Sequence, residues 1–133
     1  MNVEVEINFI EELPIDKINE YKDLVVFGVA RNVLDYTLAE NRFPYLTGEL
    51  QRSAMAEGVR KESECTYYLG AEGVDYAKRV WEYPQKTNWT NPDTYAQWYV
   101  TMYQNKTEVI TQNAIDNAIR SVKWQVKTLK IKI

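Results

Sequence analysis

The chain has 133 residues, 45% hydrophobic and 26% charged, the balance of one globular domain, so we treat residues 1–133 as a single domain. It contains no histidine and one cysteine, which excludes a catalytic triad with an imidazole base, a zinc site built on histidine or on four cysteines, and an internal disulfide. The net charge of −3 argues against a protein that binds nucleic acid by neutralising phosphates.

The N-terminal segment predicts a strand followed by a long helix. In residues 2–9 apolar and polar residues alternate, which is the period of a half-buried strand. Pro14 ends this segment, and Asp16 is the expected N-cap of a helix that runs from residue 15 to about residue 41. Gly28 lies in the most apolar part of this helix. Because glycine lowers helix propensity, we expect it to pack closely against a neighbouring backbone.

A second, shorter helix is predicted after Pro44, which stops the first one. It extends from residue 48 to about residue 57, with Thr47 as its expected cap. Leu50 and Ala54 are spaced to lie together on its inner face.

The middle of the chain predicts a strand and a turn. Residues 59–69 alternate in polarity as one long strand, with Cys65 as a small buried side chain on its inner side. Residues 70–73 form a turn that would close a hairpin. Residues 74–83 fit either a strand or a short helix, and the polar residues 84–92, with two prolines, are expected to form an exposed loop.

The last third of the chain predicts a long helix and a final strand. Asn91, Pro92 and Asp93 form a helix start, and apolar residues continue at helical spacing to Val126, with a break expected near residues 105–107. The later face of this helix is expected to carry Ile115, Ile119, Val122 and Val126. The tail returns to period two, with apolar positions at Leu129, Ile131 and Ile133.

The two ends of the chain carry opposite charges. Glu4 and Glu6 in the first strand would form favourable cross-strand pairs with Lys130 and Lys132 in the last. We predict that the terminal strands join one sheet, within a chain or between neighbours, and contribute to an oligomer or partner interface. The whole pattern predicts an α+β fold: a small, mostly antiparallel sheet packed against a long N-terminal helix and a long C-terminal helix.

No catalytic pattern stands out, so we expect no enzyme activity, no cofactor and no bound metal. Four acidic residues flank the aromatic middle, as in a site that cleaves sugars: Glu62, Glu64, Asp75 and Glu82. Their spacing gives no pair a reason to converge, and a solvated face also explains them. No apolar run has the length of a membrane span, and we expect no membrane association.

The predicted loop of residues 84–92 contains one large ring, Trp89, between Asn88 and Thr90. An exposed tryptophan is typical of a surface that a partner covers. The ring could instead fold back onto the domain's own surface. Asn88, Trp89 and Thr90 are therefore candidates for an oligomer or partner interface.

Residues 44–84 contain short motifs in a distinctive order. These are Pro-x-x-Thr-Gly-x-Leu-x-x-Ser, then Gly-Val-x-Tyr-Ala, then a Glu-aromatic pair: Pro44, Thr47, Gly48, Leu50 and Ser53; Gly73, Val74, Tyr76 and Ala77; Glu82 and Tyr83. This middle third of the chain resembles the minor capsid and tail-completion proteins of tailed bacteriophages and prophages. The glycine that usually follows the Glu-aromatic pair in that family is Pro84 here.

The resemblance implies a structural virion protein of the head–tail junction, a connector or tail-completion protein without enzyme activity. It implies a homo-oligomeric, hexameric ring in the phage neck, with other neck proteins and the tail-tube protein as partners. DNA would pass through this ring without sequence-specific binding. The protein would be made in the cytoplasm of the bacterial host and end in the virion.

Two other functions remain open from the residues alone. A carbohydrate-binding or carbohydrate-active domain would need Trp81, Trp89 or Trp98 to line a groove together with aspartate or glutamate. A small nucleic-acid-binding module would use the tyrosines and the basic tail.

Overall fold

A computed structural model describes residues 3–9, 14–44, 48–70, 77–82, 93–122, 124 and 127–132. The elements in chain order are β1 (Glu4–Phe9), α1 (Ile15–Ala39), α2 (Glu49–Glu57), β2 (Val59–Ser63), β3 (Thr66–Leu69), α3 (Ala77–Glu82), α4 (Trp98–Asn105), α5 (Thr107–Ser121) and β4 (Lys127–Lys132). The predicted α+β class is confirmed. The described strands form two separate two-stranded antiparallel sheets, β1–β4 and β2–β3, instead of one.

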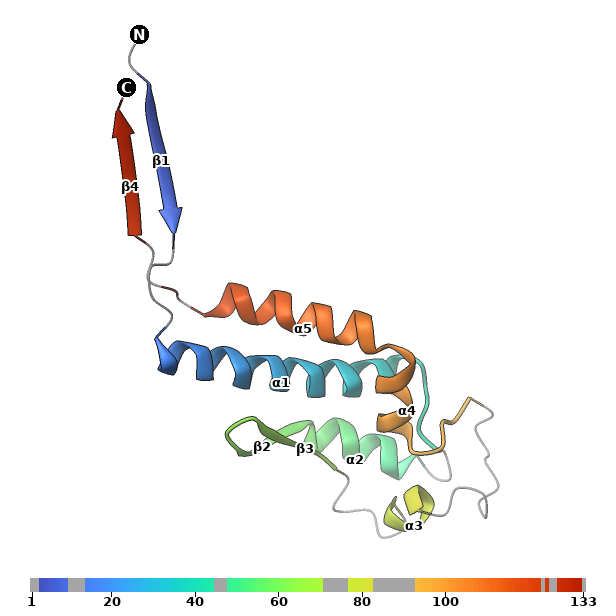
Figure 1. The fold of residues 1–133 in the computed structure, drawn as a ribbon. Helices are drawn as coiled ribbons and strands as arrows, with labels where there is room; N and C mark the ends of the chain where they lie inside the picture. Colours follow the sequence, from blue (N-terminus) through green and yellow to red (C-terminus); the bar gives the residue numbers. More distant parts are fainter. Residues whose placement is uncertain are drawn as a thin grey trace.

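Helices α1 and α5, far apart in the sequence, lie antiparallel along each other and form the main body (Figure 1). Gly28 allows this approach, because a Cβ added there would lie 2.9 Å from the Cβ of Ala114 and 3.2 Å from its Cα. The side chain of Asn32, one turn further along α1, donates a hydrogen bond of 3.1 Å to the carbonyl of Ile110. The predicted close packing of Gly28 against another backbone is therefore confirmed.

The ends of α1 agree with the predicted range to within two residues. The prediction of Asp16 as N-cap is wrong: Pro14 occupies that position, and its carbonyl accepts a hydrogen bond of 3.1 Å from the amide of Ile18. Asp16 lies inside the first turn, where its negative charge interacts favourably with the positive end of the helix dipole. After the last turn, Asn41 adopts a φ of 56°, a left-handed conformation that asparagine tolerates better than most residues.

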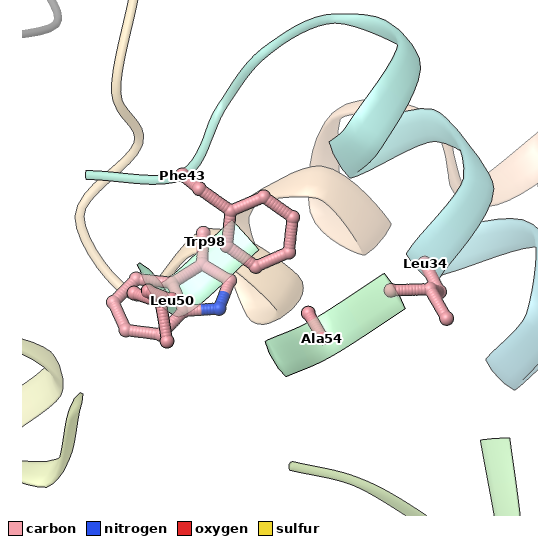
Figure 2. Close-up of a cluster of buried hydrophobic side chains, with 5 residues drawn as sticks. All are labelled: Leu34, Phe43, Leu50, Ala54 and Trp98. Carbon is pink, nitrogen blue, oxygen red and sulfur yellow. The ribbon is translucent and has the colours of Figure 1, made fainter. Parts of the chain in front are cut away.

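Helix α2 contributes to a cluster of buried apolar side chains beside the α1–α5 contact. We call this cluster the second core, and Figure 2 shows it in close-up. Leu50 and Ala54 on the inner face of α2 are each 1% exposed, as the sequence predicts. They pack with Leu34 of α1, Phe43 of the connection and Trp98 of α4. The helix is bounded by two glycines with positive φ, Gly48 at 78° and Gly58 at 61°, so the chain turns sharply at both of its ends.

The predicted single strand over residues 59–69 is wrong, because it is a hairpin. Strands β2 and β3 pair antiparallel, and the chain turns at Glu64 and Cys65. Cys65 has a φ of 58° and lies half-buried in the turn, not on the inner side of a strand. Its amide donates a hydrogen bond of 2.8 Å to Asp23 of α1, a contact that fixes the turn. The polar alternation of the sequence runs through this turn and gives no sign of it.

The predicted C-terminal helix begins later than expected. Asn91 and Pro92 lie outside the described residues, while Asp93 lies in a turn and α4 starts only at Trp98. The intervening chain bonds instead to the connection after α1. The amide of Tyr95 donates to the carbonyl of Arg42 at 3.0 Å, and the hydroxyl of Thr94 donates to that of Phe43 at 3.1 Å.

The predicted helix break near residues 105–107 is confirmed at Lys106, between α4 and α5. The helix ends at Ser121, earlier than predicted, and Val126 lies outside the described residues. The face of α5 turned to the core consists of Ile110, Ala114 and Ala118, and Val122, just after the helix, is buried on the same side. Ile119, which we expected on this face, is 50% exposed. Because Gly28 brings the helices so close, the shared face accepts alanine where a larger side chain would not fit.

Candidate interaction surface

The terminal strands β1 and β4 form a two-stranded antiparallel ribbon, which we call the terminal ribbon (Figure 1). The prediction that the two ends of the chain join one sheet is confirmed, and the pairing occurs within a single chain. Cα partners run from Glu4 opposite Lys132 to Phe9 opposite Lys127. Because paired residues of an antiparallel sheet point to the same side, this register sorts the side chains into two contrasting faces.

One side, the charged face, consists of Glu4, Glu6, Asn8, Thr128, Lys130 and Lys132. Glu4 lies opposite Lys132 and Glu6 opposite Lys130, so the cross-strand pairs predicted from the sequence are present. The Lys130 ammonium also lies 4.0 Å from a carboxylate oxygen of Glu4 on the diagonal. These exposed pairs set the register more than they add stability, since each is worth well under about 1 kcal/mol.

The other side, the apolar face, consists of Val3, Val5, Ile7, Leu129 and Ile131. All five side chains are between 38% and 48% exposed, although Val5 lies directly opposite Ile131 and Ile7 opposite Leu129. The ribbon projects away from α1 and α5, and none of the described elements covers it (Figure 1). An isolated two-stranded ribbon is marginally stable in water, so this face is suited to burial by another surface.

Both outer edges of the terminal ribbon are open among the described strands, since β1 pairs only with β4 and β4 only with β1. Neither strand contains proline or glycine, the residues that interrupt strand pairing. Each edge therefore presents backbone amide and carbonyl groups that a further strand could bond.

The motif residues of the middle segment take structural places. Pro44 and Gly48 are buried where the chain enters α2, Leu50 belongs to the second core, and Ser53 is half-buried on the same helix. These positions explain the motif as the turn and anchor of a short helix. They do not approach the terminal ribbon.

Two further motif residues lie on α3. Ala77 is half-buried and packs against the second core, while Glu82 is exposed, with a carboxylate oxygen 3.9 Å from the ammonium of Lys78. The remaining predicted positions lie outside the described residues: Thr47, Gly73, Val74, Tyr76, Tyr83, Asn88, Trp89 and Thr90.

A polar cluster that the sequence does not reveal joins the β2–β3 hairpin to α1. Asp23 accepts hydrogen bonds from the Tyr67 hydroxyl at 2.6 Å, the Cys65 amide at 2.8 Å and the Lys61 ammonium at 3.2 Å. The bond from Tyr67, followed by that from Cys65, lowers the pKa of Asp23 below its ordinary value of 3.8. Burial and the bond to Asp23 raise the pKa of Tyr67 to about 12. Because all donors point at one carboxylate, we interpret this cluster as a clamp for the hairpin.

The residues considered for sugar chemistry do not gather in the described structure. Trp98 is 4% exposed, and Trp81 meets it edge-on with ring centroids 4.8 Å apart, so both rings fill the second core and neither lines an open groove. Glu62 and Glu64 are exposed on the hairpin. Asp75 and Trp89 lie outside the described residues.

Among the described residues, no cluster of three or more acidic or cysteine side chains is placed to hold a metal ion. None of the described helices is long and apolar enough to cross a membrane. Comparisons of the chain with protein-family models, with curated proteins and with solved structures gave no match.

Proposed function

We propose that this chain is a structural protein of the neck of a tailed phage or prophage, where it forms a ring at the head–tail junction through which DNA passes. The order of motifs over residues 44–84 supports this family. The observation that carries the proposal is the terminal ribbon: its apolar face is exposed, and its two edges are open among the described strands.

The ribbon supports an assembly role for an energetic reason. Burying apolar surface contributes roughly 25 cal/mol per Å², and the five apolar residues of the ribbon leave much of that contribution unused in one chain. Burial of these five residues against a neighbouring surface would add this free energy to the stability of the assembly. Apolar side chains that only stabilise the fold are normally buried within their own chain.

The charges of the terminal ribbon fit a protein that lets DNA slide past. Lys130 and Lys132, which belong to the basic tail, lie opposite Glu6 and Glu4, so the charged face carries both signs. Together with the net charge of −3, this leaves little attraction for phosphates. The nucleic-acid-binding alternative depends on a basic surface, which this face does not supply.

The proposal is tested in the phage or prophage that encodes the chain. We expect mass spectrometry to detect the chain in purified virions. Deleting its gene should leave DNA-filled heads and free tails that do not join, visible by electron microscopy. Adding the purified protein, or a Val109→Thr control altered at an exposed position of α5, should restore joined particles. Intact infectious virions that form without the chain would contradict the proposal.

A further inference from the structure

We propose that the terminal ribbon pairs edge to edge with the ribbon of a second copy of this chain, the open edge of β1 in one copy receiving the open edge of β4 from the next. This inference rests on the proposed function, because a ring makes a second copy of this chain the expected partner. The pairing is selected by the charges of the two strands, because β1 is acidic and β4 is basic.

The charges of the two strands are complementary. Among its charged residues β1 carries only glutamates, Glu4 and Glu6, whereas β4 carries only lysines. Pairing of two β1 edges would place glutamate beside glutamate, and pairing of two β4 edges would place lysine beside lysine. Only the β1–β4 arrangement places opposite charges side by side, so like-charge repulsion disfavours both symmetric alternatives.

The register between copies follows from the register within one copy. In an antiparallel pair, residues not hydrogen-bonded to the partner direct their backbone groups to the outer edge, at matching positions on both strands. If the two copies pair in the same register as β1 and β4 within one chain, these outward backbone groups form hydrogen bonds between the copies. Glu4 and Glu6 then lie beside Lys132 and Lys130 of the second copy. This register also aligns the apolar faces, so Val5 of one copy packs beside an isoleucine of the next.

The symmetry of this contact suits a ring. Each copy offers one β1 edge and one β4 edge, so the contact is head-to-tail and every copy has two neighbours. A head-to-tail contact generates a closed ring when its rotation closes, whereas a symmetric contact stops at a dimer. The merged sheet carries one continuous apolar side and one side of alternating charge.

A charge-exchanged chain tests the pairing. The variant E4K/E6K/K130E/K132E keeps every cross-strand pair within its own ribbon, so it should fold and assemble with itself as the wild-type chain does. In a mixture, each contact between variant and wild type meets like charges. We expect affinity-tagged wild-type chain to retain the variant about tenfold less than untagged wild type, the size expected when two exposed charge pairs become repulsive. Equal retention of the two would overturn the pairing, as would a wild-type chain that stays monomeric at millimolar concentration.

Disulfide trapping provides a second measurement. In a Cys65→Ser background, one chain carries Val5→Cys and the other carries Ile131→Cys, so neither contains an internal cysteine pair. Under mild oxidation we expect cross-linked dimers in the mixture and none in either variant alone. Dimers formed by Val5→Cys with itself would place β1 against β1 and overturn the proposal.

The two proposals fail in different ways. Cross-linked dimers from a chain absent from virions would leave the ribbon pairing standing and refute the neck function. A chain found in virions that mixes freely with its charge-exchanged variant would refute the ribbon pairing and leave the neck function standing.

Discussion

At the scale of single residues, two positions on α1 determine what packs against it. Gly28 has no side chain, and Ala114 of α5 occupies the space that a Cβ would fill. Asp23, one turn and a half earlier, gathers three donors from the hairpin. Both positions act through partners at least 38 residues away in the sequence, so small changes there alter how distant elements pack on α1.

Replacing Gly28 by alanine should destabilise the protein. Alanine favours the helix by about 1 kcal/mol, but its Cβ would approach Ala114 within 2.9 Å, and the helices must separate. We expect a net loss of about 1–2 kcal/mol in the free energy of unfolding, measured by chemical denaturation. The exchanged pair G28A/A114G moves the methyl group to the other helix and should recover most of this loss. Equal stability of G28A and wild type would show that the helix contact is looser than described.

The Asp23 clamp makes the hairpin sensitive to pH at both extremes. Because the pKa of Asp23 is lower in the folded chain, its contribution to stability is present above its ordinary pKa of 3.8 and disappears as the pH falls through the lowered value. The pKa of Tyr67 is raised from 10.0 to about 12, so its contribution is present below pH 10 and disappears as the pH rises through about 12.

Tyr67→Phe should remove this coupling while keeping the ring contact with Phe27, whose centroid lies 5.5 Å away. We expect a loss of about 1 kcal/mol in unfolding free energy at neutral pH, since one hydrogen bond to a carboxylate is lost in a half-buried site. The pKa of Asp23, followed by NMR, should move up toward its ordinary value. Tyr68→Phe, at the neighbouring and more exposed ring, should change neither quantity. An unchanged Asp23 pKa in Tyr67→Phe would refute the clamp.

At the scale of elements, each short segment is held by a few anchors on its inner face. Helix α2 is too short to be stable alone and depends on Leu50 and Ala54, which pack with Phe43 and Trp98. The hairpin depends on its bonds to α1 in the same way. The packed elements therefore belong to one cooperative body.

Leu50→Ala should cost about 2–5 kcal/mol, because the side chain is 1% exposed and its removal leaves a cavity between α2 and the aromatic rings. Met55→Ala on the same helix is the matched control. That side chain is 62% exposed, and we expect a change within about 0.5 kcal/mol. Thermal or chemical unfolding measures both. Similar losses in the two variants would mean that α2 does not dock through Leu50.

At the scale of the whole molecule, the packed helices and the terminal ribbon have different tasks. Helices α1, α4 and α5, with α2 and the hairpin, bury a continuous apolar interior. The ribbon contributes little to that interior and keeps its own apolar side exposed. We therefore expect stability and self-association to be separable by substitution.

Threonine at Val5, Ile7, Leu129 and Ile131 tests this separation, because threonine retains strand propensity and removes apolar surface. We expect the unfolding temperature of the helical body to change little and self-association, measured by light scattering, to be weakened, because Val5 of one copy loses its packing beside Ile131 of the next. Threonine at Val109 and Ile119, two exposed apolar positions on α5, should leave association intact. Undiminished association of the ribbon variant would show that the apolar side chains contribute nothing to the contact between ribbons.

The sequence by itself determined most of the elements and the terminal ribbon, because the elements follow from local periodicity and the pairing of the terminal strands follows from their opposite charges. Period two at Val3 to Phe9 and Leu129 to Ile133, with opposite charges at the two ends, predicts two strands that pair with glutamate opposite lysine. The long first helix, the short second helix and the break at Lys106 follow from spacing in the same way.

Only the tertiary structure decided where the chain turns at Cys65, why α4 begins at Trp98, which face of α5 is buried and that no described helix or hairpin covers the ribbon. The turn depends on Asp23, and the buried face on Gly28, both distant in sequence. Alternation shows that one side of a strand is apolar, but it does not show what packs there. That information resides in contacts between distant residues, which no local pattern encodes.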